Sequence, residues 1–286
     1  MDAREEIVEL DDGARLWTVT EGEGPPVVLC HGGPGGKDTL APVARMIADM
    51  AQVHRYDQRA CGRSSGGPPF TMARWIADLD ALRRHWNHPR WVVAGHSFGA
   101  AIALGYALEH AEHTDAVVYL SCVVRLDGHP DWYEQYRRAR LERLPPPLRR
   151  RYQELRAGRL DPALEVELRK LSARTDFGDP DGAEQLVKVH EAELAMVNGD
   201  VNRQLGADFQ RAFQAPAARH RLRALDLPVL LVHGEVDPRP VAAVHALASE
   251  LRHSRLVILD RVAHFAYWEA PETLRRVLRD FLVTRT

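Results

Sequence analysis

The sequence predicts an α/β fold: a mostly parallel, eight-stranded sheet with helices on both faces and an inserted helical block. Three observations support this prediction. Strand-like apolar runs alternate with helical patterns up to residue 121, which is typical of a parallel sheet. The composition then changes to Arg, Glu, Leu and Ala, without a β-rich run, as far as residue 223. The alternation of strands and helices finally resumes and continues to residue 286.

The first part of the sheet is predicted from short runs rich in β-branched residues. Asp11-Asp12-Gly13 separates the first two runs and is a turn signal typical of hairpins. Helical patterns follow at 41–50, at 72–86 and directly after Ser97. The expected strands of this part are 7–10, 16–19, 27–30, 53–56, 91–94 and 116–120.

The middle of the chain is expected to form a helical cap, comprising residues 122–223. Pro145-Pro146-Pro147 and Gly178-Asp179-Pro180 break this region, and the segments between them have amphipathic helical spacing. Strands then follow at 227–232 and 255–259, and a final helix begins near Ala270 with proline in its first turn. We therefore expect one core domain, residues 1–121 and 224–286, interrupted by the cap.

Composition excludes several classes of partner. The 286 residues are 45% hydrophobic and 27% charged, with a net charge of −2, so nothing indicates binding to nucleic acid or to an anionic membrane. The sequence begins with acidic, polar residues, and no apolar run is long enough to span a membrane. Cys30, Cys61 and Cys122 lie far apart without a C-x-x-C pair, which favours reduced thiols in a cytoplasmic protein.

Gly95-His96-Ser97-Phe98-Gly99 fits the G-x-S-x-G pattern of a nucleophile elbow. An apolar run precedes it and a helical pattern follows it, so a strand–turn–helix unit would expose the hydroxyl of Ser97. Side chains at the flanking glycine positions would clash across such a turn. The N–H groups at the start of the helix favour negative charge at the same place. On the pentapeptide alone, a simple small-residue turn is the alternative.

A serine nucleophile needs a histidine base, and the histidine needs a carboxylate to fix its tautomer. Asp237 follows a predicted strand, where open parallel sheets place their ligands. Glu235 is the rival acid; Asp237 is favoured because it lies deeper in the loop and precedes Pro238. His264 follows the last predicted strand and precedes the final helix, so it is the candidate base.

The oxyanion of an acyl-transfer reaction needs two fixed N–H donors. The backbone of Phe98, directly after the serine, is expected to supply one. The glycine-rich loop at 31–36 is expected to supply the other, from Gly33 or, as second choice, Gly32. The same glycines suit a phosphate cradle, but the Lys and Ser/Thr of a P-loop do not follow in register.

Together these residues resemble the α/β-hydrolase superfamily and, within it, the prolyl aminopeptidases. His31-Gly32-Gly33-Pro34-Gly35 is similar to the oxyanion loop of that family, and residues 57–64, DQRACGRS, are similar to its D-Q-R-G-x-G-R-S segment. Residues 233–239, HGEVDPR, resemble its acid loop. The elbow differs: prolyl aminopeptidases usually have G-G-S-W-G, whereas His96 and Phe98 make this elbow look equally like those of esterases and thioesterases.

The resemblance also implies cap glutamates that bind the free amine of the substrate. The family's Trp-Glu pair does not occur in the cap region of this chain. A second family glutamate precedes a V-N-G stretch; here Val197-Asn198-Gly199 is present, and Glu191 and Glu193 flank the expected position. On a helix these two would point about 200° apart, so at most one is expected to reach the substrate. A solvated helix face is the alternative explanation for both.

We therefore expect a serine hydrolase that forms an acyl-enzyme and releases an N-terminal, proline-type residue from small peptides or amides. The alternative is an esterase, thioesterase or lactonase that acts on a small metabolite. A non-catalytic ligand-binding protein of the same fold is a third possibility, although such proteins are expected to lose members of the triad. The reaction requires no metal or organic cofactor, and the expected partner is a small-molecule or short-peptide substrate.

Overall fold

Eight strands form one sheet, in the order β1-β2-β4-β3-β5-β6-β7-β8. The structure, a computed structural model, describes residues 3–126, 132–189, 191–192 and 197–284. β1 pairs antiparallel with β2 and β2 with β4, and the other neighbouring pairs are parallel. The strands are β1 (Arg4–Glu9), β2 (Arg15–Glu21), β3 (Pro26–Cys30), β4 (Gln52–Tyr56), β5 (Trp91–His96), β6 (Thr114–Leu120), β7 (Val229–Gly234) and β8 (Ser254–Leu259). The predicted mostly parallel, eight-stranded sheet is confirmed.

Strand β5 lies at the centre of the sheet and carries the elbow at its carboxyl end. It pairs with β3 on one side and β6 on the other, so that Val93 lies between Val28 and Val117. All six of its residues are buried. This explains why the strand is a nearly continuous apolar run, because a central parallel strand faces helices on both sides.

Helices cover both faces of the sheet, as the sequence predicts. One buried apolar cluster joins the sheet to α2, α3 and α11, and the other joins it to α1, α12 and α13. The helices are α1 (Ala41–Ile47), α2 (Met72–His85), α3 (Phe98–Glu109), α11 (Val241–Glu250), α12 (Ala266–Glu269) and α13 (Pro271–Thr284), with a short 3₁₀ helix, η1 (Ala111–His113).

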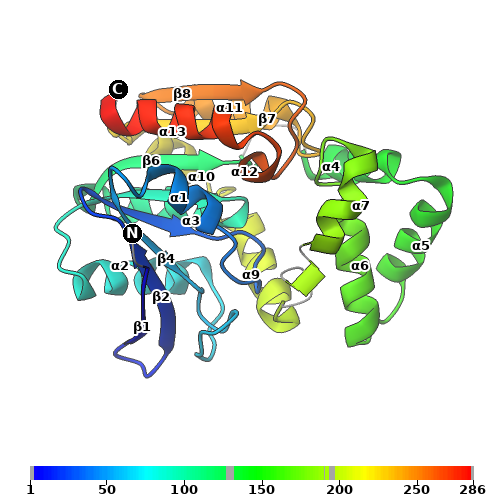
Figure 1. Ribbon diagram of the computed structural model, residues 1–286, viewed down its shortest axis with the longest axis horizontal. Coiled ribbons are helices and arrows are strands. Elements are labelled where there is room, and N and C mark those ends of the chain that lie inside the picture. The colour runs from blue at the N-terminus through cyan, green and yellow to red at the C-terminus, as the bar shows by residue number, and fades with distance from the viewer. Residues whose placement is uncertain (1–2, 127–131, 190, 193–196, 285–286) are drawn as a thin grey trace.

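The chain between β6 and β7 is helical wherever the structure describes it. Its helices are α4 (Trp132–Arg143), α5 (Pro146–Ala157), α6 (Pro162–Arg174), α7 (Pro180–Val189), α9 (Gly199–Ala212) and α10 (Pro216–Ala224). Figure 1 shows α4 to α7 to one side of the sheet, where the arrows of β7 and β8 point. The division into a core, residues 1–121 and 224–286, and a cap, residues 122–223, stays a prediction.

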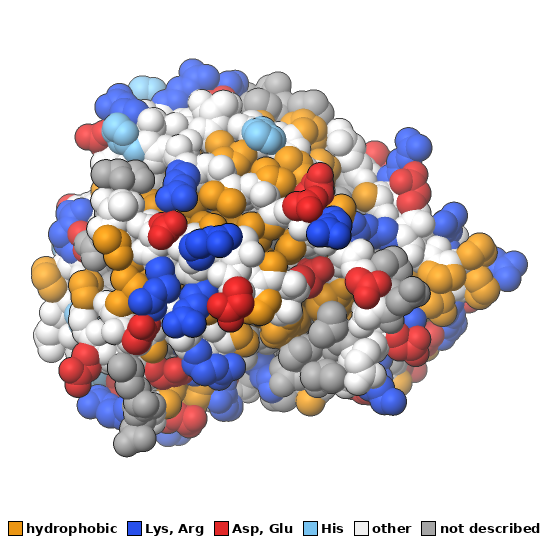
Figure 2. All heavy atoms as spheres, turned by 45° about the horizontal axis from the view of Figure 1, so that its top comes forward, with side chains coloured by type: hydrophobic (Ala, Val, Ile, Leu, Met, Phe, Trp, Pro, Cys, Tyr) orange, Lys and Arg blue, Asp and Glu red, His pale blue; other side chains and the backbone are white. Residues whose placement is uncertain are grey.

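The surface in Figure 2 carries acidic and basic side chains interspersed with apolar ones. This distribution agrees with the small net charge of −2. Within the described ranges, no helix combines the length and the apolar character that crossing a membrane requires.

Candidate active site

Ser97 lies in a sharp turn between β5 and α3. Its backbone has φ 55° and ψ −127°, a strained conformation for a residue with a side chain. A Cβ on Gly95 would overlap the backbone carbonyl of Gly99, and a Cβ on Gly99 would overlap that of Cys30. The two glycines of the motif are therefore required because β5, α3 and β3 approach one another closely at this turn.

Asp237 and His264 meet at the carboxyl end of the sheet, from loops that follow β7 and β8. His264 Nδ1 donates to Asp237 Oδ2 at 2.8 Å, and both side chains are almost fully buried. Because a carboxylate can only accept, the proton lies on Nδ1 and leaves Nε2 able to accept a proton. Glu235, the rival acid, is exposed and accepts from the backbone N–H of Arg261 at 3.1 Å.

Arg239 holds the other oxygen of Asp237. Its backbone N–H donates to Asp237 Oδ1 at 2.9 Å, and its guanidinium donates to the same oxygen at 3.0 Å. Burial alone would raise the pKa of Asp237, but the charges of Arg239 and His264 outweigh it and hold the pKa well below its usual value. Asp237 is therefore ionised and able to orient His264.

Ser97 and His264 line the same cavity, which has a volume of about 580 Å³. Its walls come from the carboxyl ends of the strands and from the helical segment, which is the chain between β6 and β7. Ser172 on α6 and Asn202 on α9 are among the lining residues of this segment. The structure thus joins Asp237 to His264 directly and places Ser97 on the same cavity. Among the hydrogen bonds of the described residues there is none between Ser97 and His264.

The glycine loop after β3 lies against the serine. Gly33 lines the cavity with φ +63°, and a Cβ on Gly32 would lie 2.9 Å from the Cβ of Ser97. Phe98 is the first residue of α3, so its N–H is one of those that have no partner within the helix. Gly33 therefore lines the cavity together with Ser97, and Phe98 directly follows Ser97 at the start of α3. The oxyanion role of both residues remains a prediction.

Gln58 and His31 fix the base of the glycine loop. The Gln58 backbone N–H donates to His31 Nε2 at 3.0 Å, and its side-chain amide donates to the His31 carbonyl at 2.7 Å. Trp75 Nε1 donates in turn to Gln58 Oε1 at 3.1 Å. The glutamine of the DQR segment therefore has a structural role, because Gln58 fixes His31 at the start of the glycine loop that reaches Ser97.

Asn198 ties α9 to the same loop. Its backbone N–H donates to the carbonyl of Gly35 at 2.7 Å, and its side chain donates to the carbonyl of Ala60 at 3.1 Å. The side-chain oxygen also accepts from the N–H groups of Asp200 and Val201, which caps the helix. The V-N-G stretch of the sequence therefore connects the helical segment to the glycine loop.

His96 and Glu269 hold the loop of His264. His96 is buried and donates from Nε2 to the carbonyl of His264 at 2.8 Å. Burial, assisted by the charge of His264, places the pKa of His96 well below its ordinary value, so it stays neutral. Glu269 accepts from the N–H groups of Phe265 at 3.2 Å and of Gly178, in the helical segment, at 2.7 Å. Sequence reasoning missed both roles, because neither residue belongs to the serine, acid and base pattern.

The two glutamates expected to bind an amine do not gain support from the structure. Glu191 is exposed, pairs with Lys170 and does not line the cavity. Glu193 lies outside the described residues. Among the described residues, the carboxylates that line the cavity are instead those of Glu165 and Asp176.

All three cysteines are free and buried. Burial raises the pKa of Cys30 and Cys61 to about 12 and that of Cys122 to about 11. None of them supplies a thiolate at neutral pH, so they do not compete with Ser97 as nucleophile.

Comparison with known proteins places these features in a family. The alpha/beta hydrolase fold family matches residues 25–271. A proline iminopeptidase of Saccharolobus solfataricus is 23% identical over 291 aligned residues, which cover 92% of this chain and 86% of that protein. A proline iminopeptidase of Heyndrickxia coagulans is 24% identical and the match covers 91% of each chain.

The solved structures agree on the fold. A 2-hydroxy-6-oxo-6-phenylhexa-2,4-dienoate hydrolase from Rhodococcus sp. strain RHA1 superposes with a TM-score of 0.69 at 23% identity, over 98% of this chain and all of that one. The family match extends over most of the sheet and over the helical segment between β6 and β7. The chain belongs to the alpha/beta hydrolase fold family.

Proposed function

We propose that this protein is a serine hydrolase in which Ser97 is the nucleophile, His264 the general base and Asp237 the residue that orients the base. The observation that carries the proposal is the buried 2.8 Å hydrogen bond between His264 Nδ1 and an ionised Asp237, beside a serine in a strained turn on the same cavity. A family match over residues 25–271 supports the same chemistry.

The reaction follows from these positions. Ser97 Oγ attacks the carbonyl carbon of the substrate while His264 Nε2 takes its proton. The N–H groups of Phe98 and Gly33 hold the oxygen that becomes negative. The tetrahedral intermediate collapses, His264 returns the proton to the leaving group, and an acyl-enzyme remains. Water, deprotonated by His264, then attacks the acyl carbon and releases the acid and free Ser97.

The first candidate substrate is a small peptide or amide with a free, proline-type N-terminus. The support comes from the relatives, because two proteins named proline iminopeptidase match more than nine-tenths of this chain. A buried ammonium group needs a charged or strongly polar partner. This candidate therefore requires a carboxylate that faces the cavity and is available to the substrate.

The charges of the cavity favour a second candidate, an ester, thioester or lactone whose acyl part carries a carboxylate. Glu165 and Asp176, the lining carboxylates of the described residues, already form ion pairs with arginines. Glu165 pairs with Arg169 at 3.1 Å and with Arg203 at 3.4 Å. Asp176 accepts from Arg239 at 3.0 Å and has Arg140 at 3.8 Å. An ammonium group would have to compete with these arginines.

Two further cations line the cavity without such a counter-charge. Lys37 and Arg156 have no carboxylate partner in the part of the chain that the structure describes. Lys37 is half-buried beside the glycine loop, and Arg156 is exposed near the end of α5. A negatively charged acyl group bound near either cation would offset its positive charge.

One set of assays tests the proposal and separates the two candidates. Purified protein is given proline naphthylamide, a neutral nitrophenyl acetate, and the mono-nitrophenyl ester of a dicarboxylic acid. Under the proposal at least one of them turns over and Ser97→Ala abolishes that turnover. Preference for proline naphthylamide selects the aminopeptidase, and preference for the acidic ester over the acetate selects the second candidate.

A matched variant checks the role of the cavity charge. Arg156→Gln should raise KM for the acidic ester and leave KM for nitrophenyl acetate unchanged if the anion contacts this cation. Absence of turnover with all three substrates, together with no labelling of Ser97 by a fluorophosphonate, would instead indicate a non-catalytic ligand-binding protein.

A further inference from the structure

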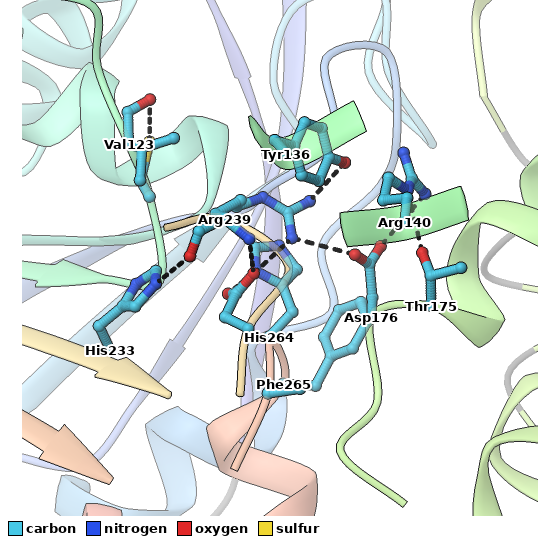
Figure 3. A network of polar contacts seen from close by, with 12 residues as sticks. Val123, Tyr136, Arg140, Thr175, Asp176, His233, Arg239, His264 and Phe265 are labelled. Atoms are coloured by element: carbon cyan, nitrogen blue, oxygen red, sulfur yellow. Dashed lines mark hydrogen bonds and ion pairs between the residues drawn. The ribbon is translucent and has the colours of Figure 1, made fainter. Parts of the chain in front are cut away.

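A buried set of charges joins the helical segment to the predicted acid and base (Figure 3). Arg239 lies at its centre, and one guanidinium nitrogen donates to both Asp176 and Asp237 at 3.0 Å. A second guanidinium nitrogen donates to the hydroxyl of Tyr136, on α4, at 3.2 Å. The acid of the core and two residues of the helical segment therefore share one cation.

Asp176 reaches the catalytic pair by a second route. Its backbone carbonyl accepts from the backbone N–H of His264 at 2.9 Å. Two residues later, Gly178 donates to Glu269, which also accepts from the N–H of Phe265, next to His264. The segment that follows α6 therefore makes two kinds of contact. Its backbone holds the loop that carries His264, and the side chain of Asp176 holds Arg239, the partner of Asp237.

The charges show why the carboxylate of Asp176 matters. Arg239 and His264 both donate hydrogen bonds to the single carboxylate of Asp237. Burial opposes the charge of Arg239, but Tyr136, Asp176 and Asp237 keep its pKa well above the ordinary value. Without Asp176, the full charge of Arg239 would fall on Asp237 and oppose the imidazolium that His264 forms during the reaction.

We infer that Asp176 is a positioning residue of this active site, so that the helical segment completes the orientation of Asp237 and His264 in addition to lining the cavity. The inference rests on the proposed serine hydrolase activity. In this inference Asp176 acts on Asp237 through Arg239, whose guanidinium donates to both carboxylates.

Asp176→Asn tests the inference, with Glu167→Gln as its matched control. Glu167 is also a carboxylate on the helical segment and pairs with Arg151 at 2.7 Å, but it does not line the cavity. Asp176→Asn should lower kcat about 10- to 100-fold with little change in KM, because small displacements of reacting groups cost this much. Glu167→Gln should retain wild-type kcat and KM.

The pH profile gives a readout that a merely structural role would not change. Among the described residues, the charged or titratable groups around His264 are Asp237, Asp176, Arg239, His96, His233 and Glu269. Asp176→Asn removes a negative neighbour of the imidazolium, which makes protonation of the base harder. The acidic limb of the kcat/KM profile should therefore move to lower pH in this variant and stay in place in Glu167→Gln.

The inference is overturned if Asp176→Asn retains wild-type kcat and an unshifted acidic limb while Ser97→Ala is inactive. If Ser97→Ala itself retains full activity, the serine hydrolase proposal fails instead, so the two failures are distinguishable. Should Asp176→Asn not fold, Tyr136→Phe removes one hydroxyl from the same network. Tyr136→Phe should lower kcat several-fold. The control is Tyr133→Phe, which lies on the same helix but outside the cavity and should leave kcat unchanged. Equal kcat values for the two variants would refute the inference.

Discussion

Replacing Asp237 with asparagine changes the tautomer of His264, and the hydrogen bonds of the site show why. Asp237 Oδ1 accepts two donors from Arg239, and Oδ2 accepts one from His264. An asparagine amide has only one acceptor oxygen. Because Arg239 presents two donors, the oxygen of Asn turns toward it and the NH₂ turns toward His264. His264 Nδ1 must then accept, so the proton moves to Nε2 and the base is lost.

The expected loss in kcat for Asp237→Asn is about 10⁴-fold, as for the equivalent tautomer error in serine proteases. At 1.36 kcal/mol per factor of ten, this corresponds to about 5.4 kcal/mol of transition-state stabilisation. Arg239 keeps Asp176 as an ionised partner at 3.0 Å in the variant. We therefore expect the protein to remain folded while it loses activity.

The assay is steady-state turnover of whichever test substrate the wild-type protein accepts, with circular dichroism to confirm the fold. Glu235→Gln is the control, because Glu235 is exposed and contacts the backbone of Arg261 rather than His264. It should keep a kcat close to that of wild type. If Asp237→Asn loses less than about tenfold while Glu235→Gln loses more, the assignment of the acid is wrong.

Three further substitutions test the packing and the electrostatics. Gly99→Ala should destabilise the protein by roughly 3 kcal/mol or more in urea unfolding, because the new Cβ overlaps the backbone carbonyls of Cys30 and His31 at the end of β3. Gly206→Ala, in α9 with nothing within 4 Å of the new Cβ, should instead stabilise by up to about 1 kcal/mol; similar effects of the two would contradict the structure. Hydrogen bonds from Arg219 and Arg223 lower the pKa of Glu250 from 4.5 to about 2, so its carboxylate stabilises the fold above pH 4.5 and this stabilisation is lost as the pH falls toward 2. The difference in unfolding free energy between wild type and Glu250→Gln should shrink over that range, and a constant difference would show that the ion pairs do not matter.

The features that sequence alone predicts are those defined by local pattern. β-branched runs mark the eight strands, and the carboxyl ends of parallel strands lie at one edge of a sheet. Residues directly after strands, such as Ser97, Asp237 and His264, are therefore expected near one another from the order of the elements alone. Position in the loop favours Asp237 over Glu235 as the acid, and the structure places Asp237, not Glu235, against His264.

The features that sequence did not predict depend on how the helical segment docks. Asp176 and Arg239 are 63 residues apart in the chain, and their contact forms only when the end of α6 meets the loop after β7. Amphipathic spacing indicates which face of a helix is apolar, but not which core loop its end will contact. The same limit applies to Glu191, which the family resemblance assigns to the substrate and the structure pairs with Lys170 at the surface.

The most direct test of Ser97 as the nucleophile is the kcat of Ser97→Ala on a substrate that the wild-type protein hydrolyses. We expect a folded variant whose kcat falls by around 10⁶, as when the nucleophile is removed from other serine hydrolases. A folded Ser97→Ala variant with near-normal turnover would contradict this role, because no acyl-enzyme could then form at this residue.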